Sequence, residues 1–160
     1  QSFALGFFFM ISAFFTPTSY LRKGPTAYLR GRLVRLGIPV LVYFFLLNPL
    51  IVYFLYVRSM GRDVAIKAYF GTGPLWFVQT LLIFSIAYYI WRTVAPEKKA
   101  KVRPPPESGQ ILAFILILSF ANFIIRIWWP VGKAFSNLQF GYFPGYIGLF
   151  AAGVLAQKND

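Results

Sequence analysis

The chain has 160 residues, of which 58% are hydrophobic, 21% aromatic and only 12% charged, with a formal net charge of +12. Soluble domains are about one quarter charged, so most of this chain cannot face water, and the composition predicts a polytopic helical membrane protein. Cysteine and histidine are absent, which excludes disulfides, thiol chemistry and a histidine base within these residues. We expect no bound metal or cofactor. We also expect no nucleic-acid partner, because the basic residues lie between apolar segments, as membrane topology requires.

Five apolar segments predict membrane helices, and the complete ones are close to the ~20 residues that span hydrocarbon. In chain order they cover about residues 2–15, 36–57, 74–91, 111–129 and 146–156. Pro39 and Pro74 fall near helix starts, whereas Pro49, which follows Asn48, falls within a span and predicts a kink. Asn122 is a polar side chain within an apolar segment and should face the bundle interior. The expected fold is an all-α bundle with about five membrane helices.

The basic residues between these segments predict the orientation of the chain. The predicted loops 16–35 and 92–110 hold five basic residues each, ten in all, while the other two connections, together with Arg126 at the end of segment 111–129, hold five. By the positive-inside rule, loops 16–35 and 92–110 are therefore cytoplasmic, and the lipid bilayer surrounds the rest.

The first basic segment contains the start of a helix. Gly24 and Pro25 mark its beginning, and the 3.6-residue period from there places Tyr28, Arg32 and Arg35 on one stripe, with Arg30 roughly opposite. An arginine pair three residues apart, beside an aromatic ring, can bind a phosphate or pyrophosphate group. The same cations can instead be topology determinants that contact lipid headgroups. The residues alone leave both interpretations open.

Three blocks of sequence resemble the acyltransferase type 3 family, integral-membrane enzymes that O-acylate bacterial surface carbohydrates and related acceptors. The first block runs from FFFMISAFF to RLGIPVLVY and contains the Arg-x-x-Arg motif as Arg32-Leu33-Val34-Arg35. The second is GPLWFV from Gly73, and the third is FPGYIGLF from Phe143, followed by Gly153. Ala13 stands where the family usually has glycine. The blocks follow the family's order across essentially all of the chain.

The resemblance implies a partial acyltransferase domain over residues 1–160, about the second to sixth of roughly ten helices. It implies transfer of an acetyl or succinyl group from acyl-CoA to a hydroxyl of a cell-surface or periplasmic carbohydrate, such as a glucan, at the bacterial inner membrane. Arg32 and Arg35 would bind the acyl-CoA phosphates, and the catalytic histidine would lie on the helix preceding these residues. The residues that would line an acyl path or pocket are Ser12, Tyr28, Trp76 and Asn122.

Simpler roles exist for several of these side chains. Ser12 can be a packing serine bonded to the backbone, Trp76 an interfacial belt residue, and Arg126 a cation that reaches toward the membrane surface. Two other functions also remain open, namely a transporter or exporter of a glycan-related substrate and a non-catalytic membrane scaffold. The resemblance favours the enzyme.

Overall fold

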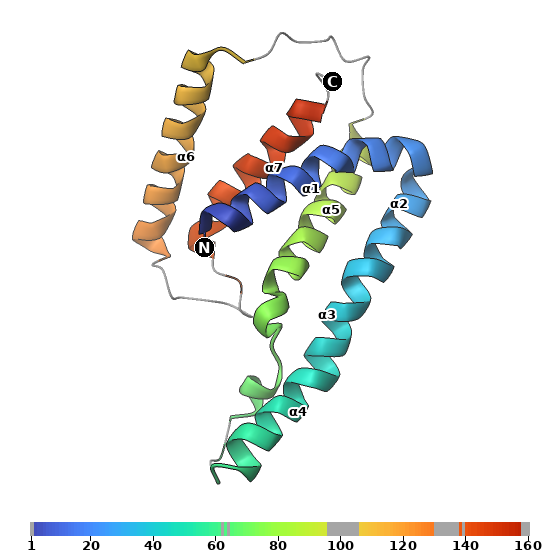
Figure 1. Ribbon diagram of the computed structural model, residues 1–160, viewed down its shortest axis with the longest axis vertical. Coiled ribbons are helices and arrows are strands. Elements are labelled where there is room, and N and C mark those ends of the chain that lie inside the picture. Colours follow the sequence, from blue (N-terminus) through green and yellow to red (C-terminus); the bar gives the residue numbers. More distant parts are fainter. Residues whose placement is uncertain are drawn as a thin grey trace.

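A computed structural model describes residues 2–61, 63, 65–95, 106–129, 138 and 140–157, and every regular element in these ranges is a helix (Figure 1). The longer helices are α1 (Ser2–Lys23), α5 (Trp76–Val94), α6 (Ser108–Trp128) and α7 (Phe143–Gln157). A further long helix combines α2 (Pro25–Arg32), η1 (Leu33–Gly37), α3 (Ile38–Val42), η2 (Tyr43–Leu47), α4 (Asn48–Val52) and η3 (Tyr53–Arg58). Short 3₁₀ turns are η4 (Ile66–Tyr69), η5 (Gly73–Leu75) and η6 (Phe140–Tyr142). The prediction of an all-α bundle is confirmed.

The helix from Pro25 to Arg58 is continuous over 34 residues, which corrects the expected start near residue 36. Its π-helical turns η1 and η2 end at Gly37 and Leu47, each two residues before a proline. A wider π turn relieves the clash between a proline ring and the preceding turn, so the helix passes Pro39 and Pro49 without ending. At 1.5 Å per residue the helix is about 51 Å long, longer than the ~30 Å hydrocarbon layer.

The predicted loop 16–35 is almost entirely helical. Helix α1 continues through Pro17 to Lys23, eight residues beyond its predicted end, and only Gly24 separates it from α2. Helix α6 begins at Ser108, three residues earlier than expected, because Glu107 and Gln110 form a capping box at its first turn. Of the predicted loop 92–110, residues 96–105 lie outside the described residues.

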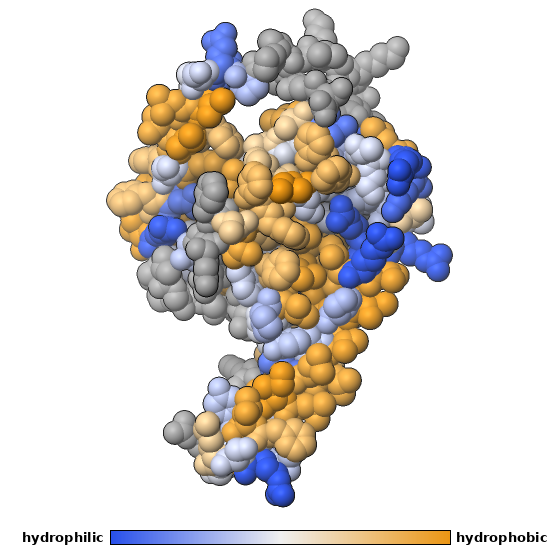
Figure 2. Space-filling model, viewed as in Figure 1, coloured by the Kyte–Doolittle hydropathy of each residue, from blue (hydrophilic) through white to orange (hydrophobic). Residues whose placement is uncertain are grey.

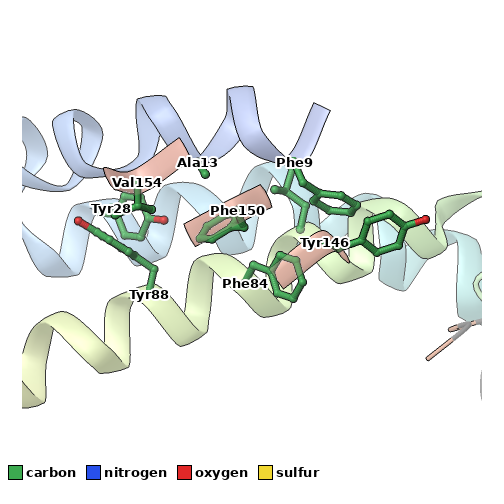
Figure 3. Close-up of a cluster of buried hydrophobic side chains, with 9 residues drawn as sticks. Phe9, Ala13, Tyr28, Phe84, Tyr88, Tyr146, Phe150 and Val154 are labelled. Carbon is green, nitrogen blue, oxygen red and sulfur yellow. The ribbon is translucent and has the colours of Figure 1, made fainter. Parts of the chain in front are cut away.

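The core lies where α1, α2, α5 and α7 meet, and aromatic side chains fill it (Figure 3). Phe9 of α1 packs against Tyr146 of α7 and Phe84 of α5, with ring centroids 4.9 and 5.5 Å apart. Gly153 of α7 lies directly against the Met10 carbonyl, and a Cβ there would lie 2.9 Å from the Ala13 Cβ. Small residues therefore allow the backbones of α1 and α7 to approach closely.

Within the part of the chain that the structure describes, four helices are long and apolar enough to cross a membrane: Ala4–Lys23, Pro25–Arg58, Gly73–Val94 and Ser108–Trp128. The fifth predicted membrane helix exists as α7, but its 15 residues are fewer than the ~20 of a complete span. Figure 1 places the α1–α2 junction, the end of α5 and the start of α6 at the same end of the bundle, the arrangement that the predicted topology requires. The chain is a multi-pass membrane protein.

Candidate functional site

The junction between α1 and α2 positions the basic residues. Gly24 has a φ of +79°, a conformation that residues with a Cβ rarely adopt, so the chain can turn sharply there. Its N–H donates a hydrogen bond to the Tyr20 carbonyl, and its own carbonyl accepts one from the Tyr28 N–H. The turn brings α2 back against both α1 and α5.

Arg32 is held by two side chains at this turn. Its Nη2 donates a hydrogen bond to Thr16 Oγ1 at 3.2 Å, and its guanidinium carbon lies 5.5 Å from the centre of the Tyr28 ring. Thr16 is fully buried, and its hydroxyl donates to the Ser12 carbonyl at 2.9 Å. The guanidinium is therefore held through one N–H, and its other N–H groups remain available to a ligand. Ser12 contributes its backbone oxygen, which accepts the hydrogen bond from the Thr16 hydroxyl.

Tyr20, Tyr28 and Tyr88 form a tyrosine triad beside Arg32. Their ring centroids are 5.6 Å apart for Tyr20–Tyr28, 5.8 Å for Tyr20–Tyr88 and 6.3 Å for Tyr28–Tyr88. Arg92, near the end of α5, is only 7% exposed, and its guanidinium carbon lies 5.7 Å from the centre of the Tyr20 ring. Two arginines from different helices thus flank one aromatic cluster, where cation–π contacts offset part of the cost of burying charge.

The predicted Arg32–Arg35 pair is only partly assembled. Arg32 and Tyr28 are in contact, as the predicted stripe requires. The Arg35 side chain is exposed, and among the described residues it has no hydrogen-bonding or ring partner. Arg30 is also exposed. Arg92, which the sequence offered only as one of several basic loop residues, takes the second position in the cluster.

The other two predicted lining residues lie at the opposite end of the bundle. Trp76, at the start of α5, is half-buried against Tyr146, with ring centroids 6.2 Å apart. Asn122 of α6 lines a cavity of about 500 Å³ between α1, α6 and α7. Between the two ends, Phe9, Phe84 and Phe150 fill the interior and are at most 9% exposed. The described helices therefore pack an aromatic core between their two ends.

Several residues of the cluster were missed by sequence reasoning. Thr16, Tyr20 and Tyr88 lie on apolar helices, where a hydroxyl-bearing residue carries no signal of its own. The sequence clue was the number of tyrosines, ten in 160 residues, but their meeting depends on how α1, α2 and α5 pack.

This end of the molecule is suited to binding anions. Figure 2 shows hydrophilic surface gathered around the α1–α2 junction, beside the hydrophobic surface of α3 and α4. The carboxylates among the described residues are Asp63 and Glu107, and neither contacts Arg32 or Arg35. A guanidinium without a carboxylate partner presents its N–H donors to phosphate or carboxylate groups of a ligand.

Fold and site together define a multi-pass helical membrane protein with a basic, tyrosine-rich cluster at one end. A family model described as "Acyltransferase domain", that of the acyltransferase type 3 family, matches residues 1–160. The chain belongs to this family, and it is accordingly a membrane acyltransferase. Neither a curated protein nor a solved structure matches the chain.

Proposed function

We propose that the protein transfers an acyl group, acetyl or succinyl, from acyl-CoA to a hydroxyl of a cell-surface or periplasmic carbohydrate. In this proposal the protein lies in the bacterial inner membrane, and the cluster around Arg32 faces the cytoplasm, where acyl-CoA is available. The tyrosine triad positions the arginine, and the arginine binds the phosphates of the donor.

The observation that supports this proposal is the fixed environment of Arg32, in which no carboxylate of the described residues contacts the guanidinium. Its contacts with Thr16 and Tyr28 restrict the side chain before a ligand arrives, which lowers the entropy lost on binding. The planar guanidinium can then donate two parallel hydrogen bonds to one phosphate. Exposed Arg35, one turn along the same helix, is the second proposed phosphate ligand.

Activation of the acceptor hydroxyl is assigned to a histidine outside these residues, since the chain has none. The family match favours the enzyme over the two alternatives, an exporter and a scaffold.

The test uses the full-length protein in membranes, with acyl-CoA binding and acyl transfer as readouts. Arg32→Ala should weaken both on the order of tenfold to a hundredfold, because a charge-assisted contact contributes roughly 1.5–3 kcal/mol. Arg32→Lys should also be impaired, since a point charge does not reproduce the guanidinium fork. Arg35→Ala should have a smaller effect, because its side chain is not held in place.

Arg30→Ala is the matched control, an exposed arginine on the same helix. It should leave acyl-CoA binding nearly unchanged. Equal, small effects at positions 30, 32 and 35, together with free replacement by lysine, would reduce this segment to a topology signal and refute the phosphate-binding role.

A further inference from the structure

The cavity at the end of the bundle opposite Arg32 has the features of a second binding site. Its volume of about 500 Å³ lies within the range of roughly 300–1,000 Å³ typical of small-molecule sites. Three helices and the turn before α7 enclose it on several sides. Its lining residues are Gly6, Ser119, Asn122, Phe123, Arg126, Tyr142, Gly145, Tyr146 and Leu149.

Asn122 is the best-fixed polar group of the cavity. Its Nδ2 donates a hydrogen bond to the Leu118 carbonyl at 2.8 Å, which sets the orientation of the amide. Gly145 of α7 makes room for it, since a Cβ there would lie 3.3 Å from Nδ2 and 3.5 Å from Oδ1. Asn122 Oδ1 has no hydrogen-bonding partner among the described residues and can accept a hydrogen bond from a ligand hydroxyl.

Arg126 supplies the charge of the cavity. Its guanidinium carbon lies 5.0 Å from the centre of the Tyr142 ring, and its side-chain stem passes Gly141, where a Cβ would lie 3.7 Å from the Arg126 Cγ. None of the described residues that line it is acidic. Hydrophilic surface interrupts the hydrophobic surface of α6 at this end of the molecule in Figure 2. Among the described residues, the cavity therefore combines the Arg126 cation with neutral hydrogen-bonding groups.

We propose that this cavity binds the acceptor, and that the acceptor is a sugar carrying a carboxylate or phosphate group. Arg126 binds the anionic group, Asn122 and Ser119 bind neighbouring hydroxyls, and Phe123 and Tyr146 contact the apolar face of the sugar ring. This inference rests on the proposed function, because it assigns the acceptor of that reaction. It also gives Arg126 a binding role, where the sequence suggested only a cation that reaches toward the membrane surface.

An anionic lipid headgroup has the same charge but fits the cavity less well. A headgroup phosphate needs a cation and little else, whereas this cavity adds an oriented amide and the hydroxyl-bearing side chains of Ser119 and Tyr142. Several hydrogen-bonding groups at fixed positions match the adjacent hydroxyls of a sugar.

The test measures equilibrium binding of methyl glucoside, methyl glucuronide and glucose 1-phosphate to the full-length protein in nanodiscs of neutral lipid. The two anionic sugars should bind at least tenfold more tightly than the neutral one, because a contact with a charged group is worth more than a neutral contact. Arg126→Gln should abolish this preference and leave the affinity for methyl glucoside within about threefold. Arg126→Lys should retain part of the preference.

Controls separate this inference from the donor site. Arg58→Gln, at an exposed arginine of η3, should leave all three affinities unchanged. Ser119→Ala should weaken binding of all three sugars without changing acyl-CoA binding. Arg32→Ala should lose acyl-CoA binding and retain sugar binding, so that failure of the donor site and failure of the acceptor site give different results.

Two results would overturn the inference. One is equal binding of the neutral and anionic sugars, or a preference for the anionic sugars that persists in Arg126→Gln. The other is loss of sugar binding when phosphatidylglycerol is added to the nanodiscs, with recovery in Arg126→Gln, which would identify a lipid headgroup site.

Discussion

The Arg32 end and the Arg126 end of the molecule use similar residues in opposite ways. Both place an arginine over a tyrosine ring, at 5.5 Å for Arg32 on Tyr28 and 5.0 Å for Arg126 on Tyr142. Around Arg32 the tyrosines pack against one another, and Tyr28 is only 2% exposed. Around Arg126 the space is open and the arginine is exposed. Packing fixes the first arginine, whereas a ligand is needed to fix the second.

The two ends depend on the same pair of helices. Helix α1 supplies Thr16 to the Arg32 cluster and Gly6 to the cavity, and α7 packs along it between the two. The contact of α1 with α7 is therefore a structural requirement of both sites. A substitution at this contact leaves the residues of both sites unchanged. Its effect can therefore be compared with the effects of substitutions within a single site.

Gly153→Leu should have the largest effect, because it separates α1 from α7. The new side chain would meet the Met10 carbonyl and the Ala13 methyl group, and neither can move without shifting α1. We expect loss of the folded, monodisperse protein, measured by fluorescence-detected size-exclusion chromatography after extraction, and loss of both donor and sugar binding.

Gly109→Leu provides the matched control for this change. Gly109 lies in the first turn of α6, and nothing lies within 4 Å of the position of its Cβ. This variant should elute as the wild-type protein does. Normal elution of Gly153→Leu would show that α1 and α7 pack less closely than the structure indicates.

Thr16→Val should have an intermediate effect confined to the Arg32 end. Valine has the shape of threonine but cannot accept the hydrogen bond from Arg32, so the guanidinium loses one of its two restraints. The substitution removes a restraint on the guanidinium but leaves its charge, so acyl-CoA affinity should fall only about two- to tenfold, a loss of about 0.5–1.5 kcal/mol. Sugar binding at the Arg126 end should not change. A parallel loss of both affinities would indicate a general disturbance of α1 instead.

Tyr28→Phe should have the smallest effect on binding. The Tyr28 hydroxyl is buried and has no hydrogen-bonding partner among the described residues, whereas its ring carries the contacts with Arg32 and Tyr20. Removing an unpaired buried hydroxyl should leave thermal stability equal or higher, and acyl-CoA affinity within about twofold. A tenfold loss of acyl-CoA affinity would show that the hydroxyl reaches the donor and that the triad opens during binding.

Local patterns in the sequence predicted much of the secondary structure and one contact of the site. Apolar length predicted all five helical segments, and the 3.6-residue period placed Tyr28 next to Arg32. Helix ends were less well predicted. Pro17 does not end α1, and the capping box of Glu107 and Gln110 starts α6 earlier than hydropathy suggested. Hydropathy does not register a polar helical turn, and a proline within a membrane helix need not end it.

By itself, then, the sequence determined the membrane environment, the helices and the family, because composition, periodicity and short motifs are local properties of the chain. Only the tertiary structure decided that Arg92 joins Arg32 at the tyrosine triad, and that Arg126 and Asn122 line one cavity. These groupings join residues from separate helices, such as Tyr20 and Tyr88. Whether such residues meet depends on the close approach of α1 to α7 and on the turn at Gly24, since small residues let helix backbones pack and a positive φ redirects the chain.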